Sequence, residues 1–216
     1  MRICLYRHTG IILLTASAFA AGCGPTGGAF AYFFGPTPKH TIEAKFTLSP
    51  GPLLILVDDS AALDLPPQLR EFVLRALIDE FRRAGINEQV VPPSRFNEMR
   101  RSQRDLDKRG IREVGRMFDV DQVLWVHPRA FSMSDQPENA LDPAKVTVAL
   151  KVINARAEQR EAVRVWPVSE EGELVSISLA PHEVRAAGTP DALIRKMAET
   201  LAAEIGLLFH KHVLTR

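Results

Sequence analysis

The order of apolar and polar positions predicts an α/β domain in the second part of the chain. Leu53–Val57 is an unbroken apolar run, which is typical of a strand that is covered on both faces. Pro66-Pro67 then begin a helical pattern that ends at Gly85, because proline suits the first turn of a helix and glycine suits its end. The apolar positions of this helix share one face; they are Leu69, Phe72, Val73, Ala76, Leu77 and Phe81.

Shorter elements continue the alternation of strands and helices. Val90-Val91 predicts a short strand, and the stretch 111–118 predicts a short helix with apolar positions Ile111, Val114, Gly115 and Phe118. A strand over Val123–Val126 follows this helix. The segment between the strand at Val90-Val91 and the helix at 111–118 is polar, and its few apolar anchors are Phe96, Met99 and Leu106.

After residue 145 the period changes from that of a helix to that of a strand. Residues 146–153, 162–168 and 174–179 alternate between core-type and polar positions, and residues 170–173 form a turn between the last two. Thr189-Pro190-Asp191 then predicts the start of a C-terminal helix. We therefore expect an α/β (α+β) fold: a mixed sheet with a β-α-β-α-β start, antiparallel strands, and a C-terminal helix packed on the sheet.

The first 23 residues have the order of a bacterial secretory signal. Arg2 and Arg7 precede the apolar run Ile11–Phe19, which is too short to remain as a membrane-spanning helix. Ala20–Cys23 resembles the lipobox of bacterial lipoproteins, and this resemblance implies that Cys23 is acylated and becomes the first residue of the mature chain. The alternative is an ordinary cleaved signal, with Cys23 incidental and the protein released.

This N-terminal order sets the expected organisation of the chain. Residues 1–22 are the lipoprotein signal peptide, 23–50 an acylated flexible tether rich in proline and glycine, and 51–216 a single α/β domain. The tether contains Phe30–Phe34, with four aromatic residues in five. These rings either lie against lipid beside the acyl chains or fold back over the domain. Ile42–Phe46 is a candidate short edge strand.

Composition narrows the classes of partner. The chain has a net charge of +1, and removal of residues 1–22 leaves 25 Lys and Arg against 26 Asp and Glu, a charge of about −1. No basic excess exists to drive binding to nucleic acid or to hold the protein on anionic lipid. Cys23 is the only cysteine of the mature chain, so a disulfide within it is excluded.

Asp58-Asp59-Ser60, at the end of the first predicted strand, is the sharpest candidate for chemistry, because ligands of open α/β sheets bind at the carboxyl ends of strands. The stretch 55–60 is similar to the first strand of response-regulator receiver domains, whose paired acids hold magnesium. However, the later strand ends in His127-Pro128, where a receiver carries its phospho-accepting aspartate. We expect Asp58 and Asp59 to cap the strand and solvate a turn, with a hydrolase that uses them as the alternative.

The remaining polar residues form no recognisable catalytic or metal-binding set. The histidines have no metal-ligand spacing, and His210 and His212, two apart at the end of the C-terminal helix, are expected to point to different faces. No nucleophile motif and no phosphate-binding glycine loop is present. We therefore expect no enzyme activity, no cofactor and no metal. Trp125 and Trp166 are expected in the core.

The segment Arg95–Arg116 is rich in arginine, with acids interspersed. It is either a surface for an anionic partner or a solvated helical face with internal salt bridges, and we favour the second interpretation. Its arginines are Arg95, Arg100, Arg101, Arg104, Arg109, Arg112 and Arg116.

The order of elements, together with the phrase Val114–Leu124, resembles the α/β domain of the curli-export lipoproteins, the penicillin-binding-protein activator lipoproteins and the N-terminal domain of the Tol-system propeller protein. This resemblance implies an envelope lipoprotein. The absence of a catalytic set and the presence of a long tether favour a membrane-anchored, non-enzymatic interaction, assembly or regulatory module. The alternatives are an oligomeric component of an export system and a cell-wall hydrolase. The expected partners are the membrane, through the lipid anchor at Cys23, and an envelope protein or peptidoglycan. The residue after the cysteine, Gly24, resembles the pattern of Gram-negative lipoproteins exported to the outer membrane, which implies that location, facing the periplasm. The oligomeric state is left open.

Overall fold

The computed structural model of the protein describes residues 40–58, 63, 65–103, 105–134, 143–159 and 163–214. Cys23 and the aromatic run at 30–34 lie outside the described residues. The chain divides into two units, one made of residues 41–212 and the other of residues 1–40 with 213–216. Strands β1 (His40–Ile42) and β7 (His212–Leu214) form a two-stranded sheet of their own.

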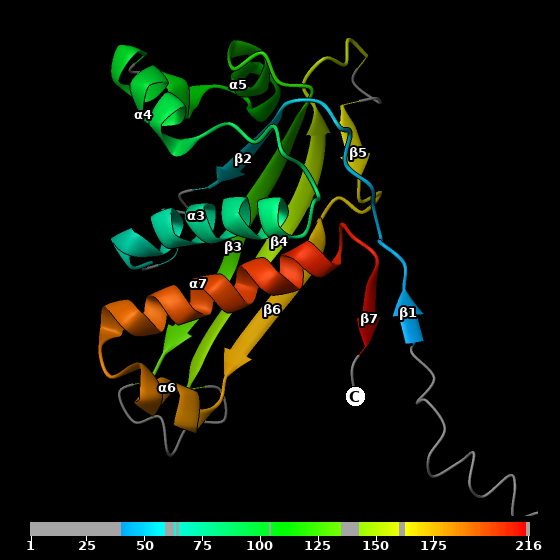
Figure 1. Ribbon diagram of the computed structural model, residues 1–216. Helices are drawn as coiled ribbons and strands as arrows, with labels where there is room; N and C mark the ends of the chain where they lie inside the picture. The colour runs from blue at the N-terminus through cyan, green and yellow to red at the C-terminus, as the bar shows by residue number, and fades with distance from the viewer. Residues whose placement is uncertain are drawn as a thin grey trace, which may run out of the picture. The chain divides into compact units, whose positions relative to one another are not determined.

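The unit of residues 41–212 is built on a five-stranded mixed sheet (Figure 1). Strand β2 pairs in parallel with β3, β3 pairs antiparallel with β4, and the far edge of β4 pairs antiparallel with both β5 and β6. The elements are, in chain order, β2 (Leu53–Val57), α3 (Pro67–Arg83), α4 (Pro93–Ser102), the 3-10 helix η1 (Leu106–Lys108), α5 (Ile111–Met117), β3 (Gln122–Met133), β4 (Ala144–Asn154), β5 (Arg164–Trp166), β6 (Glu173–Leu179), α6 (Pro181–Ala187) and α7 (Pro190–Leu207). The predicted α/β fold with a mixed sheet and a C-terminal helix packed on it is confirmed.

Strand β2 is covered on both faces, as its unbroken apolar run predicts. Leu53, Ile55 and Val57 belong to the larger hydrophobic cluster, whereas Leu54 is buried in a second cluster and Leu56 packs against it. This division follows from the alternation of side chains along a strand. A strand of this kind needs a layer of helices on each side of the sheet.

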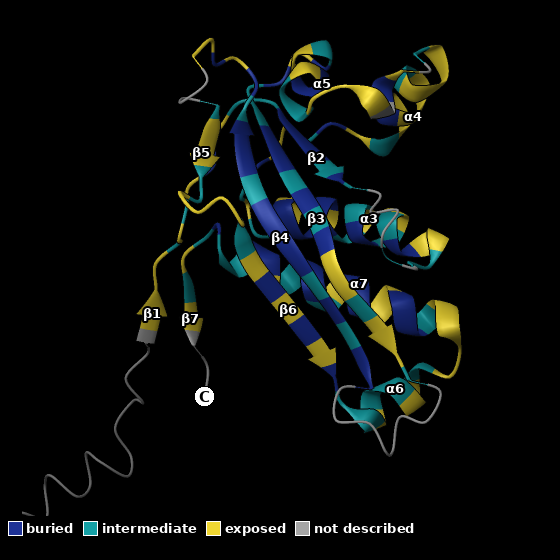
Figure 2. Cartoon of the chain, turned by 180° about the vertical axis from the view of Figure 1, so that it is seen from behind, coloured by how far each residue is buried: buried dark blue, intermediate teal, exposed yellow. Residues whose placement is uncertain are grey.

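The first layer consists of α3 and α7, which lie side by side on one face of the sheet (Figure 1). Figure 2 looks onto the opposite face of the sheet, where most residues of β2 and β4 are buried and buried residues alternate with exposed ones along β6. Leu77 and Phe81 of α3 and Met197 and Leu201 of α7 are completely buried. Helix α7 begins where the sequence predicts, because the side chain of Thr189 accepts a hydrogen bond of 3.2 Å from the N–H of Ala192.

The second layer is smaller and consists of α4, η1 and α5. Its buried residues pack with the other side of β2 and β3; they are Phe96, Leu106, Val114, Phe118 and Val120. Gly115 lets α5 approach the sheet closely, because a Cβ atom there would lie 2.7 Å from both Ala155 Cβ and Val123 Cγ2. The predicted helix at 111–118 and the predicted apolar anchors of the arginine-rich segment are therefore confirmed.

Four local predictions need correction. Strand β3 continues past His127-Pro128 to Met133, with a register shift between Pro128 and Ala130. The strand expected at 162–168 is limited to 164–166. The strand expected at Val90-Val91 is a single bridge between Val90 and Leu53, and the edge strand expected at 42–46 lies instead at 40–42. Helix α6 was not expected from the sequence.

The last part of the predicted tether belongs to the folded unit, which includes residues 41–50. Leu48 is buried in the larger cluster, and Phe46 stacks on Trp166 with ring centroids 5.8 Å apart. The backbone N–H of Lys45 donates to the carbonyl oxygen of Leu208 at 2.8 Å.

None of the helices that the structure describes is long and apolar enough to cross a membrane.

The close approach of α5 to the sheet gives a stability prediction. Replacing Gly115 with Ala should lower the free energy of unfolding of the full chain by about 1–3 kcal/mol, because the added methyl group overpacks the contact with Ala155 and Val123. Gly110→Ala is the matched control, since a Cβ atom at Gly110 meets nothing within 4 Å. Urea denaturation of the two variants measures the difference, and equal midpoints would contradict the packing described for Gly115.

Candidate functional site

The structure brings Asp58 and His127 together at one edge of the sheet. Asp58 directly follows β2, and its N–H donates to the carbonyl oxygen of Val126 at 2.8 Å. Nδ1 of His127 lies 2.8 Å from Oδ2 of Asp58, so the imidazole N–H donates to the carboxylate. Asp59 and Ser60, the other two members of the predicted cluster, lie outside the described residues.

Trp125 lies on the same face of the sheet as His127, two residues away along β3. The ring centroids of Trp125 and His127 are 5.1 Å apart, and Nζ of Lys151 on β4 lies 5.0 Å from the centroid of the indole ring. Burial lowers the pKa of Lys151 below its ordinary value, and the nearby positive charges of Arg164 and Arg129 act in the same direction. Trp125 is half-buried rather than a core residue, whereas Trp166 packs against the larger cluster as predicted.

A cavity of about 710 Å³ opens beside Asp58, between α3, α4 and the carboxyl end of β2. Its floor is apolar and is formed by core residues; among them are Val126, Val146, Val148 and Leu201. Its polar lining comes mostly from helices; it comprises Asp58, Arg70, Glu71, Arg75, Ser94, Asn97 and Arg100. This combination of an apolar floor with a few polar groups at the opening is typical of a ligand-binding cavity.

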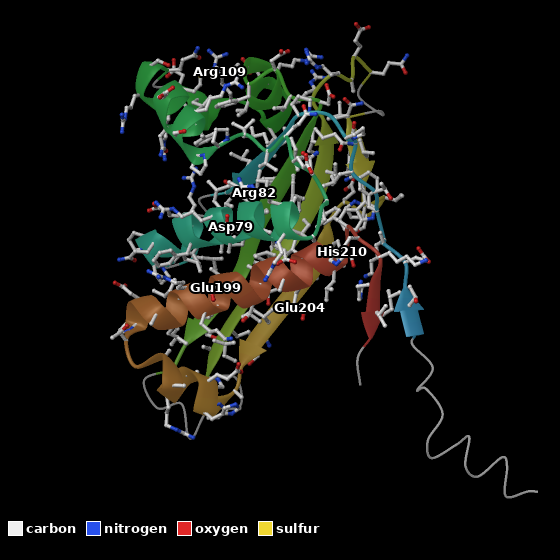
Figure 3. The ribbon with its side chains drawn as sticks, in the orientation of Figure 1. Asp79, Arg82, Arg109, Glu199, Glu204 and His210 are labelled. Carbon is white, nitrogen blue, oxygen red and sulfur yellow. The ribbon has the colours of Figure 1, made fainter. Side chains whose placement is uncertain are left out.

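A smaller cavity of about 300 Å³ lies on the other side of Asp58. It shares Arg70 and Arg100 with the first cavity and adds Arg109 and Trp125. We call Arg70, Arg100 and Arg109 the arginine rim. The rim brings together one residue from α3, one from α4 and one from the segment before α5, and Figure 3 places Arg109 between α4 and α5.

Arginine is the commonest charged residue in the linings of the two cavities. It contributes four side chains, whereas Asp58 and Glu71 are the acidic residues among the described lining residues. Two of the four arginines have acidic partners, because Arg75 is paired with Glu71 and Arg109 with Glu113, and Asp58 is bonded to His127. Arg70 also stacks over the ring of Phe96, with its guanidinium carbon 5.9 Å from the centroid, which orients the side chain toward α4.

The arginine-rich segment divides into two parts with different roles. Arg116 donates from Nε to the carbonyl oxygen of Ala155 at 2.9 Å and from a terminal nitrogen to that of Ala157 at 2.8 Å. Arg112 donates to Ala157 as well, at 3.4 Å, and Arg109 is paired with Glu113. This half of the segment therefore holds structure, in agreement with the favoured interpretation. In the α4 half, Arg95 and Arg101 are exposed and Arg100 lines the cavities, whereas Arg104 lies outside the described residues.

Three other charged residues, which Figure 3 labels, line neither of the two cavities. Asp79 and Arg82 of α3 and Glu199 of α7 are exposed and lie on the outer side of the helical layer (Figure 3). Asp79 and Arg82 pair with each other at 3.6 Å, which contributes little to stability at such exposure.

The expectation for the C-terminal histidines was wrong. Helix α7 ends at Leu207, so His210 and His212 lie beyond it, and their ring centroids are 5.8 Å apart. Nδ1 of His210 lies 2.8 Å from the carbonyl oxygen of Gly206, so the ring caps the helix end. Within the described residues, no three side chains of His, Cys, Asp or Glu gather as a metal site would need.

The similarity of this chain to known proteins is limited to distant likenesses of structure. No protein-family model and no curated protein matches the sequence. A PelC dodecamer from Paraburkholderia phytofirmans is 11% identical, with 80% of this chain and 96% of that chain covered and a TM-score of 0.44. The lipoprotein GNA1162 from Neisseria meningitidis is 13% identical, with 70% and 99% covered and a TM-score of 0.40.

A third solved structure, the hypothetical protein CT253 from Chlamydia trachomatis, is 12% identical, with 73% and 96% covered and a TM-score of 0.37. These neighbours thus include a lipoprotein and an assembled dodecamer. Identities and TM-scores of this size carry no information about the site.

The division of the arginine-rich segment can be tested by comparing two arginines. Arg116→Ala should lower the free energy of unfolding by about 1 kcal/mol, because two carbonyl oxygens lose a charged donor. Arg101→Ala, on the exposed side of α4, should leave it unchanged within about 0.5 kcal/mol. Chemical denaturation of both variants measures the two free energies of unfolding. A larger loss in Arg101→Ala than in Arg116→Ala would refute the structural role of Arg116.

Proposed function

We propose that the protein is a lipoprotein of the bacterial cell envelope, acylated at Cys23, whose folded unit is a non-enzymatic interaction module. The observation that carries the interaction role is the arginine rim beside an apolar cavity of about 710 Å³. The anchor rests on the sequence: two arginines, a short apolar run and Ala-Ala-Gly-Cys. The proposed location is the outer membrane, facing the periplasm, in keeping with Gly24 after the acylated cysteine.

The rim suits a carboxylate of an envelope partner. A guanidinium group binds a carboxylate through two parallel hydrogen bonds and keeps its charge at any physiological pH. Arg70 and Arg100 come from two different helices and line both cavities, so a carboxylate placed between them would contact both. The stem peptides of peptidoglycan and the acidic side chains of an envelope protein are partners of this chemistry.

A cell-wall hydrolase is the second candidate, and one observation favours it. The bond of 2.8 Å between Asp58 and His127 lies beside a cavity, and such a pair can act as a general base. The non-enzymatic proposal requires that the full chain release no product from purified peptidoglycan. Release that is lost in Asp58→Asn would establish the hydrolase instead.

The anchor is tested by labelling growing cells with an alkyne analogue of palmitate. The wild-type chain and Cys4→Ser should incorporate the label equally, because Cys4 lies in the signal that is removed. Cys23→Ser should incorporate none and should leave the membrane fraction. Equal labelling of all three proteins, or of none, would contradict acylation at Cys23.

The binding role of the rim is tested by reversing one charge. Arg100→Glu should reduce binding about tenfold, because the new carboxylate at position 100 repels the carboxylate of the partner. Binding is measured as the amount of full chain that sediments with peptidoglycan, or that crosslinks to its envelope partner in cells. Arg101→Glu is the matched control, since it makes the same charge change at the neighbouring position of α4, which does not line either cavity. Equal losses in both variants would leave only a net-charge effect, and unchanged binding in Arg100→Glu would rule out the rim.

A further inference from the structure

Strand β6 forms an open edge of the sheet. It pairs with β4 along its whole length, from Leu150 opposite Glu173 to Ala144 opposite Leu179. Among the described residues, none pairs with its outer side, and Figures 1 and 2 show no strand beyond β6 in the sheet. Alternate residues of this seven-residue strand therefore direct their backbone N–H and C=O groups away from the sheet.

The edge lacks the devices that usually protect an edge strand from pairing. Residues 174–179 contain no charged residue and no proline, and the register with β4 shows no bulge. Glu173, the one charge of the strand, is paired with Lys45. Leu174 leaves 57% of its surface exposed on the face of the sheet opposite α3 and α7.

The opposite edge of the sheet is partly blocked. There, the N–H of Leu53 donates to Gln89 at 3.0 Å, and the carbonyl oxygen of Leu53 accepts from Val91 at 2.9 Å. The segment that follows leads directly into α4. The two edges of the sheet thus differ in how much of their outer side is open to pairing, and β6 can pair with another strand along all seven of its residues.

We propose that β6 pairs antiparallel with β6 of a second copy of this chain, about a two-fold axis at Ser176. Ser176 is the midpoint of Glu173–Leu179, so this register pairs all seven residues of each strand. It places Val175 opposite Ile177 of the second copy on the face covered by helices, and Leu174 opposite Ser178 of the second copy on the open face. Pairs of β-branched residues stabilise an antiparallel sheet at such positions.

This register also avoids repulsion between like charges. The two copies of Glu173 lie at opposite ends of the paired strands, each across from Leu179, and Ser176 faces its own counterpart. A two-fold axis perpendicular to the sheet places the α3 and α7 layer of one copy and that of the second copy on the same face, so the two sheets continue into one. The pairing does not depend on acylation of Cys23, because β6 lies in the folded unit.

The register is tested by disulfide crosslinking of the full chain in cells. Ser176→Cys should form a crosslinked dimer on mild oxidation, because residues directly opposite in an antiparallel pair have Cα atoms about 4.5–5.5 Å apart, within disulfide range. Ser178→Cys is the matched control: its two copies would be separated by four residue steps, about 13 Å, and should not crosslink. The parent chain, whose one cysteine after removal of the signal is Cys23, gives the background.

A second variant tests the association without a new disulfide. Ser176→Lys places two positive charges across from each other, so it should weaken dimerisation of the detergent-purified full chain about tenfold or more in sedimentation velocity. Ser176 is exposed, so the variant should keep its circular dichroism spectrum. A monomeric wild-type chain, equal crosslinking at 176 and 178, or a ring larger than two copies would each overturn the proposal, and a ring would favour the export-component alternative.

Discussion

The parallel pairing of β2 with β3 is the contact from which the remaining architecture follows. Five residues of β2 lie beside Gln122–Val126, and both faces of β2 are apolar, so each face must be covered. One layer of helices, α3 and α7, covers the first face, and α4, η1 and α5 cover the second. Because Val57 lies beside Val126 in this parallel register, the next residues, Asp58 and His127, also lie together, at the carboxyl end of β2 where the cavity opens.

Much of the fold follows from local sequence signals. The apolar run at 53–57, the alternation at 146–153 and the cap at Thr189 each predict their element, since burial on both faces, burial on one face and helix capping leave distinct patterns. The pairing of β5 and β6 with β4 could not be predicted from such signals, because partner choice depends on contacts distant in sequence. The continuation of β3 past Pro128 could not be predicted from local signals either. Proline usually ends a strand, but a register shift against β4 accommodates it here.

The candidate site shows the same limit. Asp58 stands out in the sequence, but its bond to His127 requires knowing that the strands at 53–57 and 123–126 are parallel neighbours. The arginine-rich segment is predicted as a salt-bridged helical face, and this holds for the pair of Arg109 with Glu113. Only the fold reveals that Arg100 joins Arg70 at a cavity. The distinction arises from the helical turn of α4, which directs adjacent residues such as Arg100 and Arg101 to different surroundings.

We propose that the anchored protein binds its partner at the cavity between α3 and α4. Site-specific photo-crosslinking in cells distinguishes this cavity from the rest of the surface, with the crosslinker at Asn97, which lines the cavity, or at Glu98, its exposed neighbour on α4. We expect an adduct with an envelope partner from position 97, little from position 98, and loss of the adduct in Cys23→Ser. Equal adducts from both positions that persist in Cys23→Ser, or no adduct from position 97, would rule out binding by an anchored protein at this cavity.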